Sequence, residues 1–442
     1  MKKLMKIENN SMYYNNYNLA SLAEKYGTPL RVTFLDVIYK RVKELKNSFD
    51  KAIKELSYQG KFIYLNANKA NYGSREVETS FIASDGLETS SYYDMLFTHE
   101  LFKKHPEFKD KYLVCNGYKR SDYINAILKA YQEGYKVIDV IDSLDEYEAL
   151  KKSNEEIEIG LRIHLKALYK EEDEDIENDR FGLMDKEVNY ILNDLKNTKL
   201  KLTTIHFHQR GFEYEDEKFR ENFCEVFNNY YVKAKRMYDT VVNFDMGGGT
   251  PLGETYDFDY NHWAKEVIKL LKELSNKHQI EEPNLISENG KYSQKDACVN
   301  IYKVVAKKYT DKYPWFLIDG SLLIAMPEYY ALGEPILVEP LNNLDAKMIK
   351  ARLGGLTCDC DDVYAKENGY ILLPECNEPL YIGLLGTGSY QASMNGKGGI
   401  HHCLLPEEID LVIDDLEENH KEIIRHPLQS IDDVLKLNKF KN

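Results

Sequence analysis

The chain has 442 residues, enough for two domains, because a single hydrophobic core stops growing near about 250–300 residues. Its formal net charge of -15 argues against nucleic acid or an anionic membrane surface as a partner, since both select for basic patches. No apolar run approaches the length of a membrane span, and no apolar segment follows the basic start. We therefore expect neither a signal peptide nor a membrane anchor, and a cytoplasmic location.

Seven cysteines are spread along the chain, and without a signal peptide we expect free thiols rather than disulfides. Cys358 and Cys360 are one residue apart, which is not the usual spacing of zinc ligands. His401-His402-Cys403 and the pair His206 and His208 offer ligand types that metals accept. Because no matching second pair accompanies them, we expect no metal site.

The first predicted elements are a short helix, a strand and a long helix. Leu19 to Tyr26 and Leu35 to Leu56 carry apolar residues at helical intervals, and Pro29 to Phe34 between them is strand-like. We assign residues 1–39 to a segment that precedes the main domain.

Eight β-rich runs follow, most of them with a segment of helical periodicity after them. This alternation predicts parallel strands joined by helices, and eight such units over about 240 residues match a (β/α)8 barrel. A doubly wound open sheet shows the same alternation and remains the structural alternative. The runs are Phe62 to Ala67, Leu87 to Ser90, Tyr112 to Cys115, Val137 to Ile141, Ile157 to Ile163, Leu202 to Phe207, Val241 to Phe244 and Leu285 to Ser287. The helical segments are Tyr92 to His105, Lys119 to Tyr131, Tyr214 to Met237 and Tyr260 to Lys277.

A second β-rich region follows, with Gly, Pro and Asn turns and without long helices. The expected fold class is therefore α/β: a TIM-type barrel over residues 40–300 and an all-β domain over 301–442, completed by residues 1–39. Pro406 to Asn442 is rich in charge and is interpreted as a helical tail. The strand runs are Ile301 to Val305, Trp315 to Ile318, Tyr370 to Leu373 and Pro379 to Leu385.

Polar or glycine residues stand at the ends of the predicted barrel strands, where the catalytic groups of such barrels lie. They are Lys69, Glu88, Asn116, Arg162, His208, Gly247-Gly248-Gly249 and Glu288. Each has a bland explanation alone, since a lysine after a strand is usually solvated and a glycine triplet is often a tight turn. Together, a lysine that can form a Schiff base, a glycine loop for phosphate and a carboxylate for a pyridine nitrogen are what pyridoxal phosphate needs.

At these residues the chain resembles the fold-type III pyridoxal phosphate decarboxylases, the family of ornithine, diaminopimelate and biosynthetic arginine decarboxylases. Tyr26-Gly27-Thr28-Pro29-Leu30 resembles the family's opening and Asn68-Lys69-Ala70-Asn71 its lysine motif. The resemblance implies that Lys69 is the Schiff-base residue, that Glu88 and Arg162 lie near the cofactor and that His208 stacks on its ring. It implies that Gly247, Gly248 and Gly249 contact the phosphate and that Glu288 contacts the pyridine nitrogen.

The resemblance extends into the β-domain. Thr357-Cys358-Asp359 looks like the element that reaches the partner subunit's site in a homodimer, with Cys358 as proton donor, and Gly388-Ser389-Tyr390 matches a phosphate-holding tyrosine at Tyr390. Asp319 and Asp359 resemble substrate positions, where carboxylates suit a cationic tail. Ser389-Tyr390-Gln391 and His401-His402-Cys403-Leu404 look more like the arginine decarboxylase branch, so arginine is the first expectation and polyamine biosynthesis the setting. Diaminopimelate, ornithine, lysine and a carboxylated polyamine remain alternatives.

The chain departs from the family's pattern at the phosphate end. Arg210-Gly211 stands where a Gly-Ser pair is usual, and Asn289 and Lys291 replace a Pro and an Arg. We expect Arg210 and Lys291 together to supply the missing phosphate contacts. Two other classes remain: a racemase of related fold, disfavoured by Glu288, and a non-catalytic inhibitor-type homologue, which is expected to have lost some of Lys69, His208, Glu288 and Cys358.

Overall fold

The computed structural model describes residues 2–165, 180–209, 217–252, 258–334, 336–364, 369–377, 379–416 and 420–441. The chain forms two compact units, Lys40–Tyr292 and Met1–Tyr39 with Ser293–Asn442. The division falls at Tyr292 rather than at residue 300, because the strand that starts at Cys298 pairs within the second unit.

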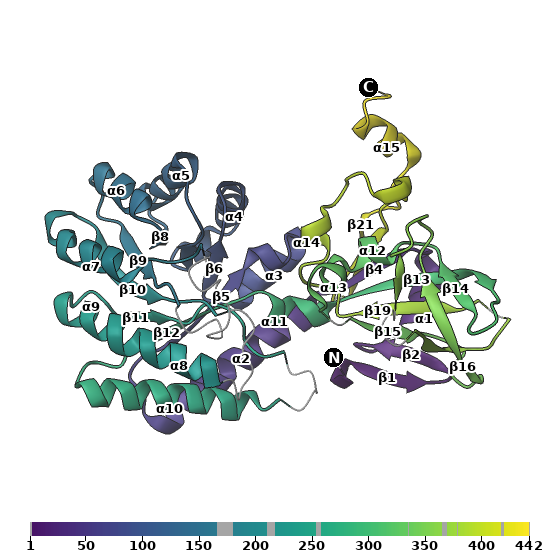
Figure 1. The fold of residues 1–442 in the computed structure, drawn as a ribbon, viewed down its shortest axis with the longest axis horizontal. Coiled ribbons are helices and arrows are strands. Elements are labelled where there is room, and N and C mark those ends of the chain that lie inside the picture. Colours follow the sequence, from purple (N-terminus) through teal and green to yellow (C-terminus); the bar gives the residue numbers. More distant parts are fainter. Residues whose placement is uncertain are drawn as a thin grey trace. The chain divides into compact units, whose positions relative to one another are not determined.

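The first unit is a closed barrel of eight parallel strands, in the order β10-β11-β12-β5-β6-β7-β8-β9 (Figure 1). This confirms the predicted barrel and excludes the open sheet. Its interior packs Ile63, Leu65, Val114, Val140 and Ile286, which come from strands far apart in the sequence. The strands are β5 (Phe62–Ala67), β6 (Gly86–Thr89), β7 (Tyr112–Cys115), β8 (Lys136–Ile141), β9 (Glu158–Arg162), β10 (Lys201–His206), β11 (Asn243–Asp245) and β12 (Asn284–Asn289).

Helices follow the strands, and several begin at side-chain caps that the sequence supplies. Ser91 Oγ accepts from Asp94 N at 3.2 Å and Asp259 Oδ1 accepts from His262 N at 3.0 Å, which satisfies backbone donors that have no partner within the helix. The helices are α2 (Leu35–Leu56), α3 (Ser74–Ala83), α4 (Tyr92–Lys104), α5 (Ser121–Gln132), α6 (Leu144–Ser153), α7 (Asp185–Asp194), α8 (Glu217–Val226), α9 (Val232–Met237), α10 (Tyr260–His278) and α11 (Lys291–Gln294).

The helix expected over Tyr214 to Met237 is not continuous. A π-helical turn, Phe227–Tyr231, separates α8 from α9, and residues 214–216 lie outside the described part of the chain. Phe227, Tyr230 and Tyr231 in this turn are buried, so the extra residue keeps large aromatic side chains against the barrel.

The second unit is built on a long β13 (Cys298–Lys308). The N-terminal β4 (Leu30–Phe34) pairs antiparallel with β13 and parallel with β20 (Ile409–Asp414), so the N-terminal segment completes the β-domain as predicted. β1 (Met5–Glu8), β2 (Ser11–Tyr14) and β3 (Tyr17–Asn18) form a separate small sheet. The remaining elements are α1 (Leu19–Tyr26), β14 (Trp315–Ile318), α12 (Leu322–Ala325), α13 (Pro327–Leu332), β15 (Leu337–Pro340), β16 (Met348–Gly354), β17 (Val363–Tyr364), β18 (Ile371–Pro374), β19 (Tyr381–Leu385), α14 (Ala392–Asn395), β21 (Lys421–His426) and α15 (Ile431–Leu437).

The expectation of a helical tail over Pro406 to Asn442 is wrong. β20 and β21 pair with each other inside this stretch, and only α15 is helical there. Leu411, Val412 and Ile413 are buried, which places this segment in the sheet despite its many charges.

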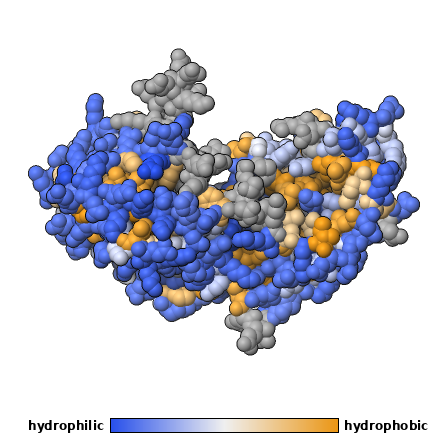
Figure 2. Space-filling model, turned by 90° about the horizontal axis from the view of Figure 1, so that it is seen from below, coloured by the Kyte–Doolittle hydropathy of each residue, from blue (hydrophilic) through white to orange (hydrophobic). Residues whose placement is uncertain are grey.

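The surfaces of the two units differ in polarity. In the view of Figure 2, hydrophilic residues cover most of the barrel unit, whereas apolar residues gather in larger areas over the β-unit. Exposed apolar side chains of the β-unit include Leu356, Met394, Ile400 and Leu404. Within the described residues, no helix is both long enough and apolar enough to cross a bilayer.

Candidate active site

The candidate lysine sits in a short turn after β5 whose backbone is fixed by buried hydrogen bonds. Lys69 belongs to the 3-10 turn Asn68–Ala70, and Asn68 Nδ2 donates to Asp94 Oδ1 at 3.2 Å and to Thr98 Oγ1 at 2.9 Å. Burial raises the pKa of Asp94 to about 7. At the neighbouring β12 end, a Cβ on Gly290 would meet Ala67 O at 2.7 Å, so only glycine lets this segment pack against the lysine turn.

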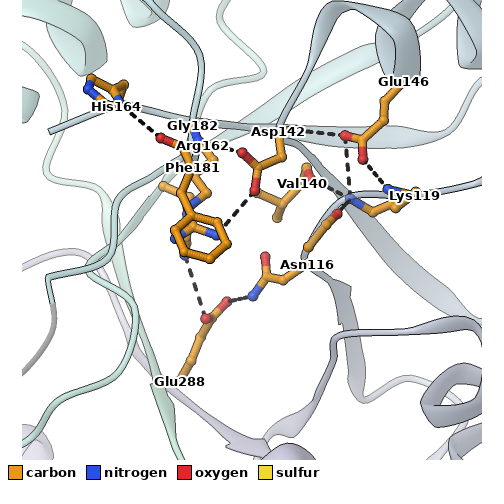
Figure 3. Close-up of polar contacts among 12 residues, drawn as sticks. Asn116, Lys119, Val140, Asp142, Glu146, Arg162, His164, Phe181, Gly182 and Glu288 are labelled. Carbon is orange, nitrogen blue, oxygen red and sulfur yellow. Dashed lines mark hydrogen bonds and ion pairs between the residues drawn. The ribbon is translucent and has the colours of Figure 1, made fainter. Parts of the chain in front are cut away.

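Two carboxylates stand beside the lysine and share one amide. Lys69 Nζ lies 3.1 Å from Glu88 Oε1, and Asn116 Nδ2 donates to Glu88 Oε1 at 3.1 Å and to Glu288 Oε1 at 2.8 Å. Figure 3 shows the contact between Asn116 and Glu288. The four side chains come from the ends of β5, β6, β7 and β12, which the barrel brings together, and Asn116 holds the two acids in a fixed relation.

The two acids have opposite protonation preferences. Burial raises the pKa of Glu88, and the charge of Glu288 adds to this effect although Lys69 opposes it. Burial alone would also raise the pKa of Glu288, but His206, Lys69 and Asn116 together hold it well below its usual range. Glu288 is therefore the ionised member of the pair, with its Oε2 3.6 Å from His206 Nε2.

A third buried acid, Asp245, lies close to Glu288. One ligand atom each of His206, Asp245 and Glu288 lie within 4.8 Å of one another. Burial, followed by the charge of Glu288, raises the pKa of Asp245 well above its usual value, so Asp245 is the neutral acid here. Its Oδ1 accepts from Gly247 N at 2.8 Å, which ties the glycine loop to the strand end.

The glycine loop after β11 packs against His208. A Cβ on Gly247 would lie 2.8 Å from His208 Nδ1, and one on Gly248 would lie 2.5 Å from Glu288 O. Gly249 has φ +100°, which L side chains rarely adopt. Gly248 N donates to His208 Nδ1 at 3.2 Å. Burial, then the charges of Lys69 and Arg162, lower the pKa of His208 to about 3, so the ring is neutral.

Arg162 is held at the end of β9 by contacts on both sides. Its Nη1 donates to Asp142 Oδ2 at 3.1 Å, and its guanidinium lies 4.5 Å from the centre of the Phe181 ring (Figure 3). Gly182 N donates to the other oxygen of Asp142. Arg162 thus adds a fixed positive charge near His208.

A second lysine near the strand ends is built into the fold. Lys119 Nζ donates to Val140 O at 2.7 Å and lies 3.7 Å from Glu146 Oε2 (Figure 3). It also donates to Gly117 O at 2.9 Å and lies 3.2 Å from Asp139 Oδ1. Burial lowers its pKa, but Asp139 and Glu146 more than compensate and the pKa is raised.

The residues that depart from the family's pattern near the phosphate lie in two parts of the chain. Asn289 Oδ1 accepts from Thr250 Oγ1 at 2.5 Å, so the residue that replaces a proline links the β12 end to the glycine loop. Lys291 begins α11 and is partly buried. Arg210 and Gly211 lie outside the described residues.

The other predicted site residues belong to the β-unit. Cys358 and Asp359 are exposed, and Tyr390 is partly buried with φ 56°. Asp319 Oδ1 accepts from Lys303 N at 2.9 Å and its other oxygen from Thr28 Oγ1, and burial raises its pKa. Their roles stay predictions.

Three contributors to the barrel site had no assigned role from sequence. Asn116 stood in the strand-end set without a function, while His206 and Asp245 are buried polar residues within otherwise apolar strands. That placement was the available signal, because a buried polar side chain in a strand needs a partner.

These strand ends define a class of protein. A lysine amine, an ionised carboxylate, a neutral imidazole and a glycine loop at one end of a barrel form the donor set of a pyridoxal phosphate-binding barrel. The fit is supported by buried atoms without a hydrogen-bond partner among the described residues, which include Glu88 Oε2 and Asn116 Oδ1.

A family model matches part of the chain. Residues 101–294 match the model of the pyridoxal-dependent decarboxylases, pyridoxal binding domain. This part of the chain is therefore similar to the pyridoxal-binding domain of these decarboxylases, and the match indicates pyridoxal 5'-phosphate as the cofactor. The match includes Arg162, His208 and Glu288 and begins after Lys69 and Glu88.

Individual relatives support the same family. The chain is 26% identical over 302 residues to a biosynthetic arginine decarboxylase of Shewanella loihica, covering 63% of this chain and 46% of the relative. It thus spans about half the length of the curated relatives that it matches. Its fold resembles the crystal structure of a biosynthetic arginine decarboxylase from Campylobacter jejuni, with TM-score 0.85, 20% identity and 99% and 89% coverage. It also resembles a diaminopimelate decarboxylase from M. jannaschii, with TM-score 0.80, 19% identity and 98% and 97% coverage.

Proposed function

We propose that this protein is a cytoplasmic enzyme that decarboxylates a basic L-amino acid with pyridoxal phosphate, with arginine as the substrate and agmatine as the product. The observation that carries the proposal is the ionised Glu288, held by Asn116 and His206 beside Lys69. An anionic carboxylate stabilises a protonated pyridine nitrogen, which decarboxylation needs. A racemase of related fold would place a cation at that position instead.

The chain's own residues have distinct tasks in this proposal. When bound, pyridoxal phosphate supplies a ring that accepts the electron pair left as carbon dioxide departs. The amine of Lys69 would hold the cofactor covalently as a Schiff base, and the carboxylate of Glu288 would keep the cofactor's pyridine nitrogen protonated. Neutral His208 offers a flat ring face without adding positive charge.

The remaining cofactor contacts concern the phosphate. The loop of Gly247, Gly248 and Gly249 would let the backbone approach the phosphate closely, although Gly247 N and Gly248 N already donate to Asp245 Oδ1 and His208 Nδ1. Lys291 and Tyr390 would add a charge and a hydroxyl. Lys291 supplies a point charge rather than the bidentate fork of the arginine that it replaces.

Substrate choice rests on the acidic residues of the β-unit. Asp319 and Asp359 would pair with the guanidinium of arginine. The relatives' names favour arginine, while the diaminopimelate decarboxylase among the structural relatives keeps that substrate as an alternative, together with ornithine, lysine and a carboxylated polyamine. The product agmatine would serve polyamine biosynthesis.

We also infer a homodimer with shared active sites, in which Cys358 and Asp359 serve the neighbouring subunit. The exposure of both side chains in the single chain supports this assignment, because a proton donor must be shielded from bulk water during the reaction. Analytical ultracentrifugation that found an active monomer would contradict it.

A candidate of another class is a non-catalytic, inhibitor-type homologue. One experiment separates it from an enzyme. Holoprotein is treated with borohydride and digested, and mass spectrometry is expected to find the cofactor's mass on the Lys69 peptide. Carbon dioxide release is then measured with arginine, ornithine, lysine and diaminopimelate. Adduct without release from any of the four would favour the non-catalytic reading, and release from diaminopimelate alone would reject arginine.

The role of Cys358 has its own test. Cys358→Ala is expected to retain the borohydride adduct on Lys69 but to divert turnover towards decarboxylation-dependent transamination, because the product carbanion lacks its proton donor. Aldehyde product and loss of bound cofactor during turnover are the readouts. A fully active Cys358→Ala variant with clean amine product would remove this role.

A further inference from the structure

Two thiols that are far apart in the sequence meet on the β-unit together with an imidazole. Cys358 Sγ and Cys403 Sγ lie 3.6 Å apart, although 45 residues separate them. One ligand atom each of Cys358, His402 and Cys403 lie within 4.8 Å of one another. The sequence offered no zinc-like spacing here, because the ligands come from two loops that only the fold brings together.

The distance between the sulfur atoms identifies the kind of contact. A disulfide bond requires about 2.05 Å, so this pair is not bonded. Two thiolates on a tetrahedral zinc, each about 2.3 Å from the ion, stand about 3.8 Å apart. The observed 3.6 Å is close to that tetrahedral edge.

Hydrogen bonds to a buried carboxylate fix the loop that carries Cys358. The buried Asp362 accepts from Thr357 N at 3.2 Å and Thr357 Oγ1 at 2.7 Å with one oxygen, and from Leu322 N at 2.7 Å with the other. A Cβ on Gly355 would lie 2.2 Å from Asp362 Oδ2, which keeps this loop close to its anchor. The thiol of Cys358 is therefore presented on a prepared loop.

The other loop is held in an unusual backbone conformation. Cys403 has φ 56° and ψ 17° within the turn His402–Leu404, a left-handed conformation that costs energy for a residue with a Cβ. Asp359 Oδ2 lies 3.7 Å from His402 Nε2, so a carboxylate adds negative charge beside the three ligands. A strained residue that aims a thiol at a second thiol is typical of a binding site rather than of an ordinary surface turn.

We propose that Cys358, His402 and Cys403 form a binding site for a soft divalent cation, with zinc as the ion. Two sulfur donors and one imidazole select zinc over magnesium or calcium, which prefer oxygen ligands. Three protein ligands leave a fourth position open to water. Binding displaces the two thiol protons. The expectation of no metal site is thereby revised for these three residues.

The site has a consequence that rests on the proposed function. An ion on Cys358 holds its sulfur as a metal-bound thiolate, which has no proton to donate. Zinc would then inhibit turnover reversibly, and chelation would restore it.

The binding test uses the full-length protein after chelator treatment and dialysis. Zinc is titrated in competition with a chromophoric chelator, and cobalt replaces zinc for spectroscopy. We expect one ion per chain, release of about two protons per ion and a thiolate-to-cobalt charge-transfer band. Cys403→Ser and His402→Ala are expected to weaken zinc binding by about 100-fold or more.

Cys360→Ser is the matched control, because Cys360 is an exposed thiol two residues from Cys358 and outside the three ligands. It should bind zinc like the unaltered chain. The proposal is overturned if the unaltered chain binds no zinc, if Cys403→Ser binds as tightly, or if Cys360→Ser is weakened equally. Unchanged thermal unfolding midpoints show that the variants are folded.

Inhibition is scored separately in the decarboxylation assay. Zinc should inhibit the unaltered enzyme at concentrations that leave Cys403→Ser active. A chain without decarboxylase activity that still binds zinc through these residues would reject the proposed function and keep the metal site.

Discussion

Lys69 and Lys119 both follow barrel strands, but their surroundings differ. The Lys119 side chain is 0% exposed, and its amine contacts two backbone carbonyls and two buried acids. The Lys69 side chain is 41% exposed and its amine lies beside Glu88. A buried amine whose hydrogen bonds are all made stabilises a fold, whereas an accessible amine next to a fixed carboxylate is available for a reaction. The position after a strand therefore does not separate the two roles.

The largest effect is expected from Lys69→Ala. Activity should fall by about three orders of magnitude or more, since the proposed function makes Lys69 the covalent anchor of the cofactor. The free energy of unfolding should change by less than about 1 kcal/mol, because the side chain is partly exposed. Carbon dioxide release and urea unfolding of the apoprotein measure the two quantities. If the Lys69→Ala variant kept full activity and borohydride fixed the cofactor to another residue, the proposed role of Lys69 would be wrong.

Lys119→Met should give the reverse pattern. It leaves Asp139 and Glu146 buried without their cation, so the free energy of unfolding should fall by about 3–5 kcal/mol. Burial raises the pKa of Glu146 to about 7 even with Lys119 present. Between about pH 4.5 and 7, Glu146 therefore stays protonated in the native state but is ionised in the unfolded chain. The decrease in the free energy of unfolding caused by Lys119→Met should therefore be larger at pH 8 than at pH 5.

In the folded fraction, Lys119→Met should still carry the cofactor on Lys69 after borohydride treatment. Lys69→Met is the matched control for stability, since it removes an amine of the same kind from the other environment. Equal destabilisation by both variants would contradict the structural role of Lys119.

The two acids beside Lys69 should differ in a similar way. Glu288→Gln removes an ionised carboxylate and should lower kcat by about 100-fold, the order expected for one preorganised electrostatic contact. Glu88→Gln, which imitates the neutral acid that the raised pKa of Glu88 favours, should cost about tenfold or less. Steady-state kinetics at saturating cofactor distinguish the two, and a larger loss for Glu88→Gln would reverse the assignment of charge.

The smallest effect concerns acid stability. The pKa of His208 is lowered to about 3, below the unfolded value near 6.5. Between these values the unfolded chain binds the extra proton, so stability contributed by the neutral ring is complete above about pH 6.5 and is lost as the pH falls towards 3. His208→Asn should reduce this loss by about 1–2 kcal/mol, allowing for the partly exposed ring. Chemical unfolding at pH 7 and pH 4.5 measures this difference. An equal change in the free energy of unfolding between the two pH values for the unaltered chain and His208→Asn would contradict the prediction.

Sequence predicted the barrel well because its strands are continuous apolar runs between turn residues. β5, β7 and α2 begin and end where their apolar patterns do. The β20–β21 hairpin was missed because its charged neighbours suggested a solvated helix, although Ile409, Leu411 and Ile413 alternate as in a strand. β21 is mostly exposed, so its own side chains carry little strand signal.

The positions of the candidate residues at the strand ends were predictable, but their contacts were not. The lysine and glycine motifs identify Lys69 and Gly247 to Gly249 locally. The bridge of Asn116 between Glu88 and Glu288 depends on strands 28 and 172 residues apart in the chain. The meeting of Cys358 with Cys403 likewise depends on two loops, so no spacing rule anticipates it.

The barrel closes by pairing its first strand with its last, and this orders events during synthesis. Glu288 pairs in register with Leu65 and Asn289 with Asn66, so the lysine turn acquires its neighbours only after residue 289 has left the ribosome. About 220 residues separate the two ends, which takes about 10–40 s at typical translation rates. A nascent chain interrupted before β12 therefore carries Lys69 without the carboxylate that would face the cofactor, and cofactor capture becomes a marker that synthesis has passed β12.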